Sequence, residues 1–123
     1  MNHQENGFVK GRIKSLKFAF KGVWLLITTE HSIMVQLGIA ILVTFVGWWM
    51  EISKTEWIFQ ILAIGLVLVA ESLNTCIEKL CDFVRPEYDN KIGFIKDIAA
   101  GAVSFAAITA IIIGLIIYLP KFL

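Results

Sequence analysis

The run IAAGAVSFAAITAIIIGLIIYL, residues 98–119, decides the fold class of this chain. It contains no charged residue, and Pro120 follows it directly. A helix needs about 20 predominantly apolar residues to cross the hydrocarbon core of a bilayer, and this run is long enough. The sequence therefore predicts a transmembrane helix over residues 96–119, with Lys96 and Asp97 at its start.

An earlier segment has the same character. Residues 33–50 are apolar except for Gln36 and Thr44, and they include Trp48 and Trp49 near their end. Tryptophan is enriched where a helix leaves the hydrocarbon core for water. We predict that residues 33–50 form the first transmembrane helix.

The segment between these two helices is less obvious. The apolar run from Trp57 to Ala70 rises only about 21 Å as a helix, against a hydrocarbon core of about 30 Å. To cross the bilayer, the helix must continue through Glu71 and Asn74. The sequence therefore predicts a second transmembrane helix over residues 57–83.

The overall composition agrees with a membrane protein. Hydrophobic residues make up 58% of the 123 residues and the mean hydropathy is +0.78, whereas soluble domains contain about 45 to 50% apolar residues. The formal net charge of +1 gives no electrostatic basis for a nucleic-acid partner. The predicted fold class is an all-α membrane protein, organised as a single domain over residues 1–123.

Residues 8–29 are predicted to form an amphipathic helix that lies in the plane of the membrane surface. At 100° per residue, apolar side chains from Ile13 to Ile27 share one face and four lysines share another. By the positive-inside rule, the basic face places the N-terminus on the cytoplasmic side of the membrane. The connector 51–56 then lies outside, and a polar loop from Pro86 to Gly93 lies inside. A helix that only orients insertion is an equally good explanation of the lysines.

Acidic residues concentrate at one level of this topology. Glu71, Asn74, Glu78 and Asp82 fall on one face of the second transmembrane helix, at spacings i, i+3, i+7 and i+11. Glu30 and Asp97 start the first and third helices at the same depth. Carboxylates at the membrane edge are costly and usually mark function. The alternative is that they pair with the basic residues of this layer, which are Lys79, Arg85, Lys91 and Lys96.

The acids of this layer suggest metal-assisted phosphate chemistry. Acids that face one another need a cation, and oxygen ligands suit Mg²⁺, which commonly accompanies nucleotide phosphates. We predict that the exposed Glu78 holds metal, while the deeper Glu71 takes a proton from a hydroxyl. Asn74 is positioned to orient that carboxylate or to hold a phosphoryl oxygen, and Lys96 offers a cation for phosphates. The chain has no P-loop and no glycine-rich nucleotide loop.

These motifs resemble a known family. The stretch ESLNTCIEKLCD at 71–82, followed by Glu87-Tyr88 and by KDIAAGAV at 96–103, is similar to the prokaryotic diacylglycerol kinase and undecaprenol kinase family. The resemblance implies a homotrimer that phosphorylates a lipid alcohol with ATP and Mg²⁺, with sites shared between chains. Glu71 would be the general base, and Glu30 and Glu78 would hold the metal.

The resemblance also implies binding sites. For the nucleotide and its metal the predicted residues are Arg12, Phe18, Glu30, Glu78, Glu87, Tyr88, Asp89, Lys96 and Asp97. For the lipid acceptor they are Arg12, Trp24, Ile33, Gln36, Trp49, Glu71 and Ala100. Three positions depart from the family pattern: Arg12 is displaced by one residue, Phe18 stands where tyrosine is frequent, and Asp89 replaces a common histidine.

The acceptor lipid and two other functions remain as alternatives. We place diacylglycerol first and undecaprenol close behind, although residues 112–120 and 52–57 look like those of undecaprenol kinases. A small cation-coupled transporter would also carry a glutamate within the membrane, but nearer its midplane. A membrane scaffold would account for the small residues of 99–102, which favour close helix packing, but not for the acids.

Overall fold

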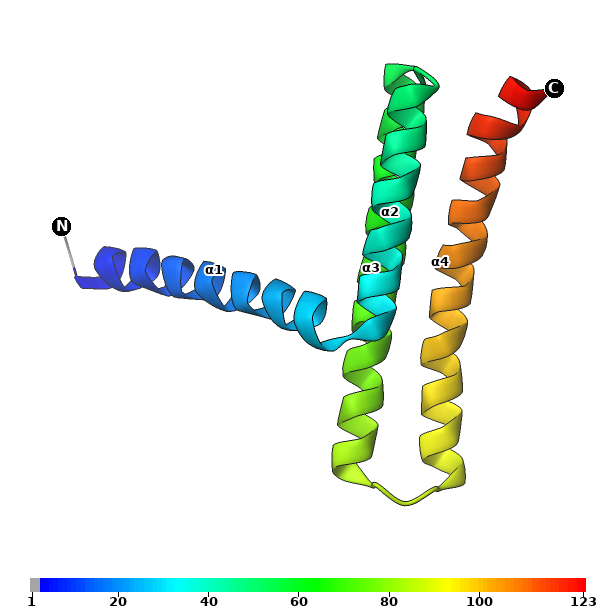
Figure 1. Ribbon diagram of the computed structural model, residues 1–123. Coiled ribbons are helices and arrows are strands. Elements are labelled where there is room, and N and C mark those ends of the chain that lie inside the picture. The colour runs from blue at the N-terminus through cyan, green and yellow to red at the C-terminus, as the bar shows by residue number, and fades with distance from the viewer. Residues whose placement is uncertain (1–2) are drawn as a thin grey trace.

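The computed structural model describes residues 3–123 of the chain, and the side chains of residues 7–123. Four α-helices account for nearly all of them: α1 (His3–Thr29), α2 (His31–Trp49), α3 (Lys54–Val84) and α4 (Asn90–Phe122). In Figure 1, α2, α3 and α4 run side by side along one axis, while α1 leaves them and extends across that axis. The described part of the chain is therefore all-helical, as predicted.

Helices α2, α3 and α4 are each long and apolar enough to cross a membrane. The 19 residues of α2 rise about 28 Å, close to the thickness of the hydrocarbon core. The 31 residues of α3 rise about 46 Å and the 33 residues of α4 about 50 Å. Figure 1 shows that α3 and α4 continue past the point where α1 joins α2.

The two ends of the bundle differ in composition. We call the end with the α1–α2 junction and the α3–α4 loop the carboxylate end, because Glu30, Glu78 and Asp82 lie there. We call the opposite end, with the α2–α3 connector and the C-terminus, the tryptophan end. Charged layers and aromatic residues at opposite ends suit helices that pass from one membrane surface to the other.

Two loops are shorter than the sequence predicted. Ser53 caps α3, with its Oγ accepting from Glu56 N at 3.2 Å while Glu56 Oε1 accepts from Ser53 N at 2.9 Å. This reciprocal capping box starts the helix inside the predicted connector 51–56. At the other end, Asp89 Oδ1 accepts from Lys91 N at 2.8 Å and caps α4. The predicted loop from Pro86 to Gly93 therefore ends at Asp89.

The break between α1 and α2 consists of one residue. Glu30 has extended backbone angles (φ −108°, ψ 111°), and helix resumes at His31. Nearly all described side chains of α1 are exposed, apolar ones such as Phe20 and Trp24 included. Within one chain, α1 has contacts mainly with α2.

A buried polar link joins the three long helices at the tryptophan end. Gln60 of α3 is 4% exposed, and its Nε2 donates to the carbonyl oxygen of Val43 in α2 at 3.3 Å. The hydroxyl of Tyr118 in α4 donates to Gln60 Oε1. Lys121 and Glu56 form an ion pair beside them at 3.1 Å. Polar side chains that satisfy one another in this way hold membrane helices together.

Gly47 lets α2 approach its neighbours closely at the same end. A Cβ atom at this position would lie 3.0 Å from Ile52 Cδ1, 3.0 Å from Tyr118 Oη and 3.1 Å from Trp57 Cη2. At the carboxylate end, by contrast, α3 and α4 pack mainly on each other. The bundle is thus tied at one end and consists largely of a helix pair at the other.

Candidate active site

The predicted acidic face of α3 lies at the carboxylate end. Glu71 and Asn74 are partly buried, and Glu78 and Asp82 are exposed, which is the gradient that the sequence predicted along this helix. Asn74 Nδ2 donates to Glu78 Oε1 at 3.4 Å, so the amide touches the carboxylate one turn further along. Within residues 7–123, Glu71 has no ion-pair partner, so its carboxylate is not neutralised by a basic side chain of its own chain.

The side-chain oxygen of Asn74 is a further feature of this site. Its Oδ1 is buried and has no hydrogen-bond partner among the described residues. A buried carbonyl oxygen without a donor costs about 1 to 3 kcal/mol, so such atoms commonly receive a donor from a ligand or a partner chain. Asn74 also lines a cavity of about 430 Å³ between α3 and α4. A hydroxyl-bearing ligand or a second chain would satisfy this oxygen.

Glu30 reaches the site from the junction between α1 and α2. Its Oε1 lies 3.1 Å from Lys79 Nζ, and its side chain is 18% exposed. Lys79 is the neighbour of Glu78 in sequence, so this ion pair brings Glu30 to the level of the predicted metal ligand. This pairing agrees with the alternative interpretation, in which the acids of this layer form ion pairs with its basic residues.

Lys96 is also paired with an acid, as in the interpretation that the acids of this layer pair with its basic residues. Its Nζ forms an ion pair with Asp82 Oδ1 at 2.7 Å, and this contact links α4 to α3. Asp97, the next residue, is exposed. Asp89 is held by the α4 cap and by Arg85, whose Nη1 lies 3.4 Å from Asp89 Oδ2. In a single chain Lys96 and Asp89 therefore already have structural partners.

One chain supplies only part of a metal site. Across residues 7–123, no three carboxylate, cysteine or histidine side chains come together in a way that could hold a metal ion. The donors that do lie in this layer are carboxylate and amide oxygens, which fit Mg²⁺ by ligand type. Glu78 is therefore only a first ligand of such a site, which further ligands would have to complete, because the Asn74 amide turns its nitrogen and not its oxygen toward Glu78.

The remaining predicted site residues are spread along the chain. Arg12, Phe18 and Trp24 are exposed on α1, and the Arg12 guanidinium lies over the Phe8 ring at 5.3 Å. Glu87, Tyr88 and Ala100 are exposed near the start of α4, and Ile33 is buried in α2. One chain therefore does not bring the α1 residues to the acidic face of α3.

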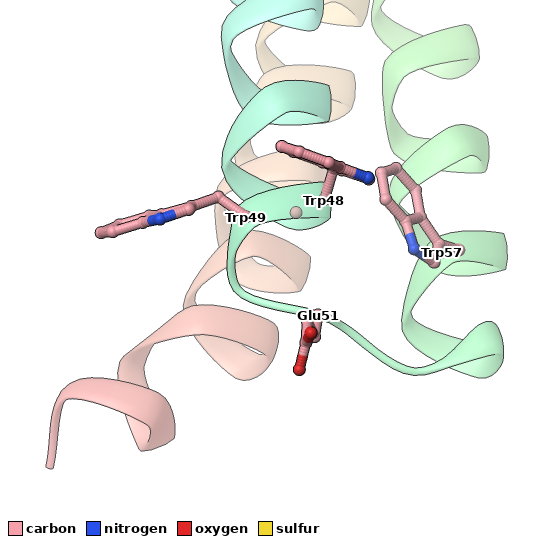
Figure 2. Close-up of a pocket in the computed structure, with 5 residues that line it drawn as sticks. Trp48, Trp49, Glu51 and Trp57 are labelled. Atoms are coloured by element: carbon pink, nitrogen blue, oxygen red, sulfur yellow. The ribbon is translucent and has the colours of Figure 1, made fainter.

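Trp49 lies at the tryptophan end, at the far end of the bundle from Glu78. It lines a shallow recess with Gly47, Trp48, Glu51 and Trp57. Figure 2 shows Trp48 and Trp57 near each other on one side and Trp49 pointing away on the other. Tryptophan rings in this position suit a membrane–water boundary. The predicted contact of Trp49 with the lipid acceptor stays a prediction.

Sequence reasoning missed two features of the molecule. It considered Lys79 as a partner for the acids in general but did not pair it with Glu30 across two helices. It also gave no role to Gln60 or Tyr118, which form the buried link at the tryptophan end. A polar Gln60 inside an apolar run was the available signal, because such a side chain needs a partner in the membrane.

Three membrane-length helices with an acidic layer at one end indicate a small integral-membrane protein. The family model for prokaryotic diacylglycerol kinase matches residues 17–118. The undecaprenol kinase of Bacillus subtilis is 37% identical over 108 residues, which cover 88% of each chain. The diacylglycerol kinase of Escherichia coli is 30% identical over 113 residues, which cover 91% of each chain.

The chain belongs to the prokaryotic diacylglycerol kinase family. It is a lipid kinase with ATP as co-substrate, and it is a bacterial membrane protein. These statements confirm the resemblance and the enzyme class predicted from the sequence. The transporter and scaffold alternatives lose their basis.

Proposed function

We propose that this enzyme transfers the γ-phosphoryl group of MgATP to undecaprenol at the cytoplasmic surface of the inner membrane. The observation that carries the proposal is Glu71, a partly buried carboxylate without an ion-pair partner in residues 7–123, one turn from Asn74 and two from Glu78. A lipid alcohol presents its hydroxyl near this depth. Glu71 would thus place a proton acceptor within reach of that hydroxyl.

The choice of acceptor follows the relatives. The sequence analysis put diacylglycerol narrowly first, and we now favour undecaprenol. The support is the 37% identity with an undecaprenol kinase, against 30% with a diacylglycerol kinase, together with the residues 112–120 and 52–57. Diacylglycerol is the second candidate, because both lipids offer a hydroxyl at the membrane surface and the reaction would be the same.

In the proposed reaction, the acceptor oxygen attacks the γ-phosphorus while its proton passes to Glu71. The bond between the γ-phosphorus and the β–γ bridging oxygen breaks, and ADP leaves. Asn74 orients the Glu71 carboxylate or an acceptor oxygen. Glu78, with Glu30, holds Mg²⁺, which spreads the negative charge of the phosphates when bound.

Nucleotide binding is proposed to use the carboxylate end beyond α2. Lys96 and Asp97 lie at the start of the membrane part of α4, and Glu87, Tyr88 and Asp89 lie in the loop that precedes it. Lys96 would exchange its contact with Asp82 for phosphate oxygens, which a surface ion pair of this kind allows at low cost. Arg12 and Phe18 would approach from α1.

The membrane orientation rests on α1. Its course across the axis of the bundle (Figure 1) supports an in-plane helix at one membrane surface, with its lysines toward the headgroups. The positive-inside rule then assigns this surface to the cytoplasm. ATP is available on that side, which agrees with the position of the acidic layer.

We further propose a homotrimer in which neighbouring chains complete each site. The incomplete metal site at Glu78, the unpartnered Asn74 Oδ1 and the course of α1 away from the other helices in Figure 1 all support this. Apolar side chains cover the outside of the bundle, and none of the large ones is fully buried in residues 7–123. A second and third chain would bury part of this surface.

The test is a phosphoryl-transfer assay with two acceptors. Purified enzyme in detergent micelles, with Mg²⁺ and γ-labelled ATP, is given undecaprenol or diacylglycerol at equal mole fraction. We expect the kcat/KM for undecaprenol to exceed that for diacylglycerol. The reverse order would make diacylglycerol the acceptor, and label in neither lipid would refute both acceptors.

A further inference from the structure

The recess at the tryptophan end is a second candidate site. It has a volume of about 460 Å³ and lies where α2 ends and α3 begins, with Trp48, Glu51 and Trp57 among its lining residues. The volume falls within the range of small-molecule sites, about 300 to 1,000 Å³. The recess is at the opposite end of the bundle from Glu71 and Glu78, so the proposed phosphoryl transfer does not use it.

Glu51 has an unusual backbone conformation in this recess. Among the described residues it is the only non-glycine residue with a positive φ, which is 53°. It ends α2 in a Schellman motif, in which Ile52 N donates to Gly47 O at 3.1 Å and Glu51 N donates to Trp48 O at 3.3 Å. Glycine is the usual residue at this position, because a Cβ atom disfavours the left-handed conformation. A residue held against such a preference points to a function, and here the group in question is the Glu51 carboxylate.

The Glu51 carboxylate is available to a ligand. Within residues 7–123 it forms no ion pair. The basic residues of this end do not neutralise it, because Lys121 is paired with Glu56 at 3.1 Å and Lys54 is exposed without an ion pair. In Figure 2 the Glu51 side chain points away from the helices, beyond the level of the tryptophan rings. The recess therefore presents a negative charge at its outer edge.

The tryptophan rings lie deeper and add two hydrogen-bond donors. Figure 2 shows Trp48 and Trp57 close to each other, with the indole nitrogen of Trp48 directed toward Trp57. Within residues 7–123, neither indole N–H donates to a protein oxygen. Each ring thus offers an apolar surface and one unused donor, a combination that suits the boundary between hydrocarbon and headgroups.

The order of these groups matches one class of ligand. From the bundle outward, the recess presents apolar ring surface, two N–H donors and then a carboxylate. A phospholipid with an amine headgroup presents hydrocarbon, then ester and phosphate oxygens, and then an ammonium group in the same direction. A headgroup without a cation would place only negative charge beside Glu51, and like charges repel each other. A metal ion is disfavoured, because no three ligating side chains come together within residues 7–123.

We propose that the recess binds an amine-bearing phospholipid, with its ammonium group at Glu51 and its phosphate or ester oxygens at the indole N–H groups of Trp48 and Trp57. The lipid bound here is not the substrate, because Glu71 lies about 21 Å from Trp57 along α3. The recess is thus a lipid-binding site at the membrane surface opposite to the acidic layer, and its occupancy does not depend on the identity of the acceptor.

The first experiment measures binding without ATP. Purified wild-type enzyme in detergent is titrated with phosphatidylethanolamine or phosphatidylglycerol of identical acyl chains, and bound lipid is counted by native mass spectrometry. We expect phosphatidylethanolamine to bind about fivefold more tightly, which is the effect of one partly screened ion pair. Equal affinities, or tighter binding of phosphatidylglycerol, would overturn the proposal.

Two further outcomes of this titration are distinguishable. Displacement of phosphatidylethanolamine by free ethanolamine at a similar concentration would overturn the lipid site in favour of a site for a small soluble amine. An enzyme that keeps the preference for phosphatidylethanolamine but phosphorylates no lipid alcohol would refute the proposed function and support the recess as a lipid site.

The second experiment separates the carboxylate from the fold. Glu51→Gly removes the carboxylate and relieves the left-handed strain, whereas Glu51→Gln removes the charge and keeps the strain. We expect both variants to bind the two phospholipids with about equal affinity, while the thermal midpoint of Glu51→Gly is no lower than that of the wild type. Loss of the preference in Glu51→Gly then does not come from misfolding.

The matched control is Lys54→Gln, which removes a charge close to Glu51 in sequence, from an exposed residue that does not line the recess. This variant should keep the preference for phosphatidylethanolamine. A preference that persists in either Glu51 variant, or that is also lost in Lys54→Gln, would overturn the role of Glu51.

The third experiment tests the indole donors. Trp48→Phe and Trp57→Phe keep an aromatic ring but remove the N–H group. Because both phospholipids carry phosphate and ester oxygens, each variant should weaken both affinities about threefold and leave their ratio unchanged. Wild-type affinity for both phospholipids in both variants would overturn the proposed contacts with the lipid oxygens.

Discussion

Glu71 is the side chain on which the proposed chemistry depends. The change Glu71→Gln keeps the shape of the side chain but removes the base. We expect phosphoryl transfer to fall by about 10²- to 10⁴-fold, which is the usual effect of losing a general base. Nucleotide binding, followed by a fluorescent ATP analogue, should stay within about twofold. Retention of more than about a tenth of the activity would assign Glu71 a positional role.

Glu78 should behave differently, because it is exposed and is proposed to hold metal. Glu78→Gln leaves an oxygen that still accepts the 3.4 Å contact from Asn74 but removes the charge that attracts Mg²⁺. The Mg²⁺ concentration for half-maximal activity should rise about tenfold or more, and excess Mg²⁺ should restore part of the rate. Unchanged Mg²⁺ dependence combined with lost activity would contradict the separate roles of the two glutamates.

The sequence predicted these residues more reliably than their partners. The i, i+3, i+7 spacing on one helix places Glu71, Asn74 and Glu78 on one face whatever the rest of the chain does, because the helix geometry is local. The Glu30–Lys79 and Asp82–Lys96 ion pairs join different helices, and their formation depends on packing that no local pattern encodes. Sequence reasoning therefore could name the candidates for pairing but not the pairs.

At the scale of a helix, the contact of α2 with its neighbours depends on Gly47. An alanine there would bring its Cβ within about 3 Å of three side chains at once. Tyr118 is held by its bond to Gln60, so it has little freedom to move aside. Overpacking of this kind typically costs about 1 to 3 kcal/mol.

We expect Gly47→Ala to lower the thermal midpoint of the detergent-solubilised protein by several degrees relative to Gly38→Ala. Both substitutions change glycine to alanine within α2, but a Cβ at Gly38 would have no neighbour within 4 Å. Thermal unfolding followed by circular dichroism measures the difference. Equal midpoints for the two variants would show that α2 shifts without cost and does not depend on this contact.

Length and hydropathy predicted which segments form helices, but they predicted the ends of these helices less accurately. The apolar runs require α2, α3 and α4 to exist, since only helices satisfy their own backbone hydrogen bonds in lipid. The starts of α3 and α4 depend instead on side-chain caps at Ser53 and Asp89. Treating Asp89-Asn90 as a turn favoured a loop up to Gly93, whereas the same aspartate caps a helix in the structure.

At the scale of the whole molecule, a single chain is incomplete. Its buried core consists of few side chains, and none of them is less than 2% exposed in residues 7–123. The polar face of α3 nevertheless needs protection from lipid, and α1 extends away from it in Figure 1. Symmetric association would solve both problems, because each copy supplies to its neighbour what it lacks itself. The resemblance of the sequence to the family already implied a homotrimer with shared sites, and the exposed apolar side chains of one chain are the observation that the structure adds.

The last prediction tests whether the active site is shared between chains. Glu30 lies at the α1–α2 junction and Glu71 on α3, so a neighbour's Glu30 could serve a site whose base comes from the other chain. Glu71→Gln and Glu30→Gln chains, each inactive alone, are co-expressed with different tags and purified as mixed trimers. An intact site forms wherever a Glu71→Gln chain supplies Glu30 to a Glu30→Gln chain that supplies Glu71. Each mixed trimer contains one intact site of three, whichever variant is in the majority, so the purified mixed trimers should restore about a third of the wild-type activity per chain.

The control is the two separately assembled variants mixed after purification, without subunit exchange, which should stay inactive. Mixed trimers verified by sequential affinity purification that remain as inactive as either parent would assign both glutamates of a site to one chain. That result would leave the proposed trimer untouched. The ion pair of Glu30 with Lys79 would then be the contact that holds Glu30 in the site of its own chain, together with Glu71. Recovery of activity would instead mean that this ion pair is a resting contact, which Glu30 leaves when it takes part in the neighbouring site.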